Sequence, residues 1–111
     1  MGKDGDARTQ TYADYLNLHE FLELQGGDEL SNDQLHFVIV HQSFELWFKL
    51  IISELRCVRD VLDQTLVPEA EVPTAVHHME RVTEIFRLMA HQWKVMGTLT
   101  PQDFQIGRAH V

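Results

Sequence analysis

The sequence contains little cysteine and little positive charge. Its single cysteine, Cys57, cannot form a disulfide within the chain, which is typical of a reducing compartment. The 9 Lys and Arg residues form no cluster and stand against 17 Asp and Glu, for a formal net charge of -8. Nucleic acid and anionic membranes repel a surface of this sign, so we expect neither as a partner.

We expect neither a leader sequence nor a membrane span. The polar start MGKDGDARTQ lacks the apolar core of a signal peptide, and no run approaches the ~18 uninterrupted apolar residues of a membrane span. We therefore expect a polar tail over residues 1–10 and a soluble, cytoplasmic protein. No glycine-rich phosphate loop and no Ser-His-Asp pattern stands out.

The apolar residues that are present recur at helical spacing. TYADYLNLHEFLELQ, residues 11–25, predicts a short amphipathic helix, and GGDELSND then supplies a break and N-cap residues. Two long helices follow, separated by the proline-bracketed segment TLVPEAEVP, and Gly97 ends the second. Their predicted apolar faces are Phe37, Val40, Phe44, Trp47, Ile51, Leu55, Val58 and Leu62, and then Val76, Met79, Val82, Phe86, Met89, Trp93 and Met96. The sequence thus predicts an all-α fold built on two long antiparallel helices plus a short N-terminal helix.

The first long helix is apolar on more than one side. Residues such as Ile39, Leu46 and Ile52 lie off the main stripe, and the helices of this chain cannot cover them all. Either more chain or another subunit must complete the packing.

His41 follows the apolar run FVIV and lies one turn from both Phe37 and Glu45. A buried neutral imidazole needs a hydrogen-bond partner. The residues alone favour a core histidine satisfied by a neighbouring helix. The alternative is a histidine that lines a pocket for a flat, apolar ligand with one polar hydrogen, flanked by Phe37 and Phe44.

The seven histidines do not form a recognisable metal site. No glutamate precedes a histidine by three residues, as carboxylate-bridged di-iron bundles require. His77 and His78 are adjacent and point about 100° apart on a helix, so we expect a solvated helix start there. We expect His91 to be a surface or interface residue.

Three stretches together resemble the N-terminal region of the tryptophan 2,3-dioxygenase family. They are TYADYLNLHEFLELQ, FVIVHQSFELWFKLIISEL and LMAHQWKVMGTLTPQDF, in the family's order and spacing from residue 11 to residue 104. The resemblance implies a larger helical haem-dioxygenase fold, of which this chain is the N-terminal part. It also implies that L-tryptophan and dioxygen give N-formylkynurenine at ferrous, b-type haem, and that the axial histidine lies outside this chain.

The resemblance also carries roles for individual residues. His41 would hydrogen-bond the indole N–H, and Phe37 would pack against indole and haem. Phe104 would add an aromatic wall, and Trp93 would lie along the haem. In a homotetramer, the N-terminal helix would carry three residues into the site of a neighbouring subunit: Tyr12, Tyr15 and Leu16.

The chain departs from the family pattern at two helix ends. NDQLHF stands where the family usually has HDExLF, and Gly97 stands where a glutamate is common. Phe37 and His41 stay in register, so neither change touches the implied pocket.

The last residues have a different origin in our interpretation. Residues 106–111, IGRAHV, are the translation of ATC GGA AGA GCA CAC GTC, the start of a common sequencing adapter whose leading AG would complete a codon for Gln105. We therefore interpret residues 105–111 as an adapter-derived, non-native tail, and the family register of Arg108 as accidental. Two rival functions stay open: a self-contained helical interaction module, and a haem dioxygenase for another indole.

Overall fold

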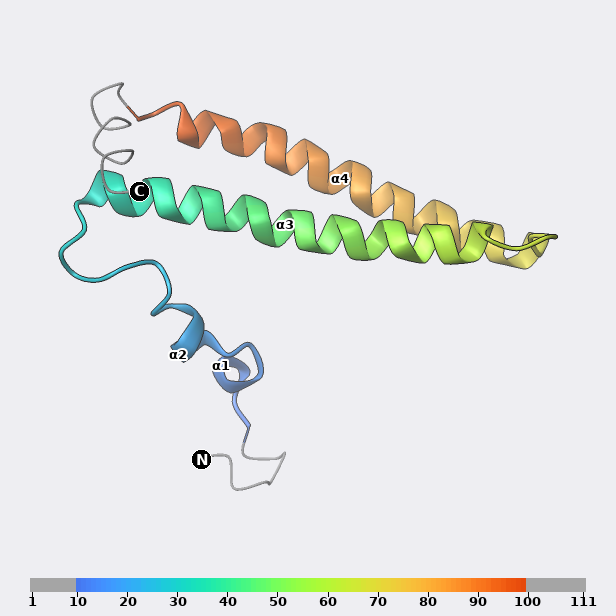
Figure 1. The fold of residues 1–111 in the computed structure, drawn as a ribbon, viewed down its shortest axis with the longest axis horizontal. Helices are drawn as coiled ribbons and strands as arrows, with labels where there is room; N and C mark the ends of the chain where they lie inside the picture. The colour runs from blue at the N-terminus through green and yellow to red at the C-terminus, as the bar shows by residue number, and fades with distance from the viewer. Residues whose placement is uncertain (1–9, 100–111) are drawn as a thin grey trace.

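The computed structural model describes residues 10–99, and the regular structure of these residues is entirely helical (Figure 1). The elements are α1 (Tyr12–Tyr15), α2 (Leu18–Phe21), α3 (Asn32–Leu62), the 3-10 helix η2 (Glu69–Glu71) and α4 (Val72–Met96). Helices α3 and α4 lie side by side and run in opposite directions. The predicted all-α fold with two long antiparallel helices is confirmed.

The ends of the long helices follow from their capping residues. Ser31 caps α3 through a capping box, in which its hydroxyl accepts from the Gln34 N–H and the Gln34 side chain accepts from the Ser31 N–H. Gln34 thus replaces the family's glutamate without loss of the cap. Pro73 lies in the first turn of α4, where its missing N–H costs nothing, and Gly97 follows the last residue of α4.

The seam between α3 and α4 follows alternating steps of three and four residues. Its buried residues are Val40, Phe44, Ile51 and Glu54 from α3, and Ala75, Val82, Ile85 and Met89 from α4. Trp47 and Met96 pack against this cluster. The spacing is that of a helix pair packed through one narrow stripe.

The predicted apolar faces were wrong at several positions, where a neighbouring residue lies in the seam instead. On α3, Leu55 is exposed and Glu54 is buried in its place. On α4, Ile85 is buried and Phe86 exposed, and Val76, Met79 and Trp93 also lie outside the seam. Two adjacent faces of α4 are apolar, so a three- or four-residue step fits either of them, and the sequence does not decide which one packs on α3.

The short N-terminal helix is divided into two single turns, α1 and α2. Asn17 lies between them with a left-handed backbone, φ 55°. Helices this short are marginal without tertiary packing, and neither α1 nor α2 buries a residue. We call residues 11–25 the N-terminal arm; in Figure 1 its helical turns diverge from the α3–α4 pair.

Much apolar surface remains uncovered, as the sequence predicted. The uncovered surface includes Leu46, Phe48, Ile52, Val76, Phe86 and Trp93. Within residues 10–99, α3 is the one helix whose length and composition would also allow it to cross a membrane, a test that core helices of soluble proteins pass as well.

Candidate functional site

Phe37 and His41 lie one turn apart on α3 and form a ring pair. Their ring centroids are 4.6 Å apart at an interplanar angle of 39°. Phe37 is half-buried, whereas His41 is exposed. The pair therefore combines an apolar ring with an imidazole that a ligand can reach.

The exposure of His41 corrects the simplest sequence interpretation. We expected a core histidine satisfied by a neighbouring helix, but the seam takes Val40 and Phe44 and leaves His41 beside it. An α-helix turns by 100° per residue, so the residue after Val40 cannot share its direction. His41 is available as a ligand-binding group rather than as part of the core.

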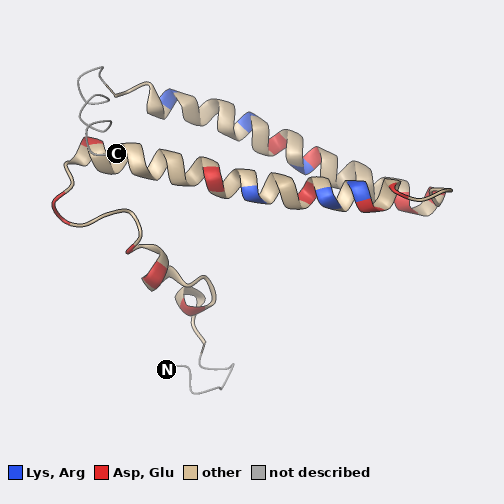
Figure 2. Ribbon diagram, in the orientation of Figure 1, with Lys and Arg blue, Asp and Glu red and all other residues tan. Residues whose placement is uncertain are grey.

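The half of α3 that carries His41 is free of formal charge over eleven consecutive positions. Residues 34–44 include no Asp, Glu, Lys or Arg, and Figure 2 shows this stretch as an uncoloured part of the helix. The charged residues of α3 gather toward its C-terminal half, from Glu45 onward. An apolar ligand surface with one polar group is typical of a small-molecule site.

Trp93 joins this region from α4. Its ring lies 5.0 Å from that of Phe44, centroid to centroid, yet 60% of the residue remains exposed. Phe44 buries one part of the indole against the seam, and the rest faces outward. Trp93 thus packs on Phe44, which lies about one helical turn after His41 on α3.

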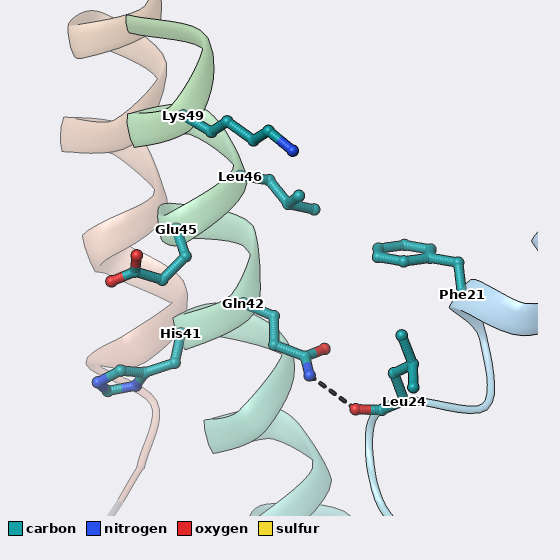
Figure 3. A pocket seen from close by; sticks show the side chains of 7 residues that line it. All are labelled: Phe21, Leu24, His41, Gln42, Glu45, Leu46 and Lys49. Carbon is teal, nitrogen blue, oxygen red and sulfur yellow. Dashed lines mark hydrogen bonds between the residues drawn. The ribbon is translucent and has the colours of Figure 1, made fainter. Parts of the chain in front are cut away.

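A hollow of about 470 Å³ separates α3 from the N-terminal arm (Figure 3). Its lining residues are Phe21, Leu24, His41, Gln42, Glu45, Leu46 and Lys49. Figure 3 shows Gln42, Leu46 and Lys49 extending toward Phe21 and Leu24, while the His41 ring leaves the helix on its other side. His41 therefore borders the hollow rather than filling it.

Three arm residues with a predicted role, Tyr12, Tyr15 and Leu16, do not line the hollow beside His41. Tyr12 is 78% exposed, Tyr15 is 71% exposed, and Leu16 is also exposed. The helical turn that carries the two tyrosines, α1, packs mainly against α2. Phe104, predicted as an aromatic wall, lies outside the described residues, as does Arg108.

A polar cluster in the seam escaped the sequence analysis. The buried Glu54 carboxylate lies 2.5 Å from His78 Nδ1 and accepts from Arg81 Nη1 at 3.0 Å. Only 21% of the His78 side chain is exposed, so the predicted solvated helix start is wrong for this residue. Two features of the sequence could have indicated this cluster. Glu54 lies three residues after Ile51, on the same face of α3, and Arg81 lies on the facing helix.

These partners change the acidity of Glu54. The hydrogen bond with His78 and then that with Arg81 lower the pKa of the carboxyl below its ordinary value of 4.5, and they outweigh the opposing effect of burial. Glu54 is therefore a carboxylate at neutral pH. It joins α3 to α4 far from His41, so it serves the fold rather than the candidate site.

Among residues 10–99, no three His, Cys, Asp or Glu side chains come close enough together to hold a metal ion.

The family model for tryptophan 2,3-dioxygenase matches residues 2–110. The chain belongs to the tryptophan 2,3-dioxygenase family. It is 38% identical over 102 residues to tryptophan 2,3-dioxygenase 2 of Ralstonia nicotianae, covering 87% of this chain and 28% of the relative. It is also 38% identical to the tryptophan 2,3-dioxygenase of Sorangium cellulosum (87% and 25%) and 33% identical to that of Dictyostelium discoideum (84% and 24%). No solved structure matches the chain significantly.

The chain spans about a quarter of the length of these curated relatives. In this chain, the structure brings Phe37 and His41 together as a ring pair and places Trp93 on the nearby Phe44, whereas Tyr12 and Tyr15 lie at separate surface positions. A complete site of this family would draw on more chain than these residues.

Proposed function

We propose that this segment contributes the substrate-binding helix of a haem-dependent dioxygenase that converts L-tryptophan and dioxygen to N-formylkynurenine. The observation that carries the proposal is the Phe37–His41 pair on the uncharged part of α3, in a chain of this family. The names of the relatives supply the substrate and the reaction class.

His41 acts on the substrate in this proposal. A neutral imidazole nitrogen accepts a hydrogen bond from the indole N–H, which fixes the rotation of the ring, and Phe37 supports one edge of it. Such a bond is stronger in an apolar, water-poor site than in water. The indole N–H is a very weak acid, so an orienting role suits His41 better than that of a general base.

The residues present suit haem as an apolar wall. Phe37 and the exposed part of Trp93 offer aromatic surface on α3 and α4, and no described cluster competes for a metal ion. When bound, haem supplies the activation of dioxygen for insertion across the indole C2–C3 bond. The axial histidine would come from outside this chain.

The N-terminal arm would act in a homotetramer. Exposed Tyr12, Tyr15 and Leu16 supply apolar and hydroxyl groups that the site of their own chain does not use, which supports their insertion into a neighbouring subunit. The lone Cys57 supports a cytoplasmic location. A net charge of -8 supports a protein that binds neither nucleic acid nor anionic membranes.

A graft tests the proposal directly. Residues 11–99 replace the matching segment of the Ralstonia nicotianae relative, to give what we call the grafted enzyme. With reduced haem it should form N-formylkynurenine from L-tryptophan, measured by product absorbance and mass spectrometry. A grafted enzyme that binds haem and assembles but leaves tryptophan intact would refute the substrate assignment.

The uncovered apolar face also suits a binding module without catalysis. The same experiment separates the two functions, because a module has no reason to support turnover in the context of a relative. Turnover of a different indole, but not tryptophan, would favour the third possibility.

A further inference from the structure

Gln42 connects the N-terminal arm to α3 through both ends of its side-chain amide. Its Nε2 donates to the Leu24 carbonyl at 2.8 Å, and its Oε1 accepts from Gln25 Nε2 at 3.1 Å. Gln25 Nε2 also donates to the Phe21 carbonyl at 2.9 Å, which closes the network within the arm. A glutamine amide has one acceptor and two donor hydrogens, so the arm engages both of its functions.

This contact joins segments that are distant in the chain. Gln42 lies 17 and 18 residues beyond its partners. No element of the arm makes more than sparse contact with α3, so the amide network is the main polar link between them. Figure 3 shows the bond to Leu24 spanning the gap between α3 and the arm.

The bond also sets one wall of the hollow. Leu24 and Phe21 face Leu46 across it, and Gln42 holds the Leu24 backbone at its edge. His41 immediately precedes Gln42 on the same helical turn. A shift of the arm root would therefore change the hollow that His41 borders.

We propose that Gln42 is a positioning residue that fixes the root of the N-terminal arm against the helical turn bearing His41. It thereby sets where the arm departs from its own subunit and where Tyr12 and Tyr15 are presented. This inference rests on the proposed function for its effect on the reaction, but not for the contact itself.

The test uses Gln42→Leu, Gln25→Leu and their combination in the grafted enzyme, with Ser43→Ala as the matched control. Ser43 is the next residue and donates only to the Val40 carbonyl within α3, at 2.8 Å. Amide hydrogen exchange is measured for the arm, residues 18–25, and for the seam segment 82–89 of α4. Steady-state turnover of L-tryptophan gives KM and kcat separately.

Gln42→Leu should raise exchange in residues 18–25 about tenfold while segment 82–89 is unchanged, since the exposed bond to Leu24 and the partly buried bond to Gln25 are both lost. KM should rise severalfold with little change in kcat. The double variant should show less than the sum of the two single effects, because both substitutions remove the same bond between Gln42 and Gln25. Ser43→Ala should leave exchange and KM as they were.

Unchanged arm exchange in Gln42→Leu would overturn the proposal, as would a uniform rise that includes segment 82–89. A local rise in exchange with unchanged KM would show that Gln42 holds the arm but does not position it for the reaction, and would also overturn it. A grafted enzyme without any tryptophan turnover would refute the proposed function, while the exchange data would still decide whether Gln42 anchors the arm.

Discussion

Glu54 is the charged side chain that the helix seam buries, and both of its partners come from α4. His78 and Arg81 satisfy the two carboxylate oxygens, so the ion is paired on each side. A buried carboxylate that loses such partners carries an uncompensated desolvation cost. Glu54 therefore fixes which residues of α4 face α3, although it does not touch the candidate site.

We predict that Glu54→Gln lowers the thermal stability of the grafted enzyme at neutral pH. His78 and Arg81 lower the pKa of Glu54 in the folded state. The stabilising effect of the Glu54 carboxylate is therefore complete above the pKa of this group in the unfolded chain, and it is lost as pH falls through the lower pKa of the folded state. The difference in melting temperature between parent and variant should therefore shrink below pH 4.5. Glu80→Gln, which changes an exposed carboxylate on α4, is the control; an equal effect of both substitutions would contradict a specific role for Glu54.

Helices α3 and α4 were predictable because their signals are strong and redundant. Apolar spacing over several turns, the Ser31 cap, Pro73 and Gly97 all indicate the same boundaries. The choice between Ile85 and Phe86 was not predictable, since both are apolar and only the position of α3 decides which is buried. His41 could be singled out from the sequence. Whether its imidazole is exposed depends on which face of α3 packs on α4, and the sequence does not decide this.

The arm was harder to predict because nothing near it stabilises a helix. The spacing of Tyr12, Tyr15 and Leu22 fits one helix, yet Asn17 adopts a left-handed conformation and divides it. Asparagine tolerates this backbone better than most residues. The contact of Gln42 with the arm could not be predicted either. A glutamine next to His41 carries no sequence pattern that indicates a hydrogen bond to a residue 18 positions earlier.

Gly26 should be essential for the turn between the arm and α3. Its φ is 113°, and a Cβ there would lie 2.3 Å from Leu30 Cδ1. We predict that Gly26→Ala destabilises this turn and raises amide exchange in residues 24–30. Gly97→Ala is the control, because Gly97 is right-handed and its new Cβ would meet only ordinary contacts at 3.5 Å.

The control substitution should be neutral or stabilise the grafted enzyme by about 0.4–1 kcal/mol through the smaller entropy of the unfolded chain. If Gly26→Ala were as well tolerated as Gly97→Ala, the left-handed turn would not be required.

The whole molecule is an incompletely covered helix pair with a projecting arm. Its uncovered apolar surface lies on both long helices, and its exposed tyrosines lie far along the arm. Both features are explained if further chain and neighbouring subunits pack on this segment. Two predictions separate these contributions.

Subunit mixing tests the arm. We predict that Tyr15→Ala and His41→Ala subunits, each poorly active alone, regain part of the activity when mixed, because a hybrid assembly contains some sites with both residues intact. Product formation after co-refolding measures this rescue. Strictly additive loss without rescue would mean that each site is built within one chain.

Expression of the 111 residues alone tests the need for further chain. We predict helical circular dichroism, strong binding of a hydrophobic dye and self-association in size-exclusion chromatography, since so much apolar surface is exposed. Specific haem uptake and turnover should be absent. A sharp monomer with cooperative unfolding, or stoichiometric haem binding that His41→Ala abolishes, would revive the independent module.

The central claim is that His41 binds the indole N–H of tryptophan, and a comparison of two ligands tests it most directly. The affinity of the grafted enzyme, with and without His41→Ala, is measured for L-tryptophan and for its benzofuran analogue, in which oxygen replaces the N–H. The account predicts that His41→Ala weakens L-tryptophan binding about tenfold, the value of one hydrogen bond in a dry site, and leaves the analogue's affinity unchanged. Equal losses for both ligands, or no loss for tryptophan, would contradict it.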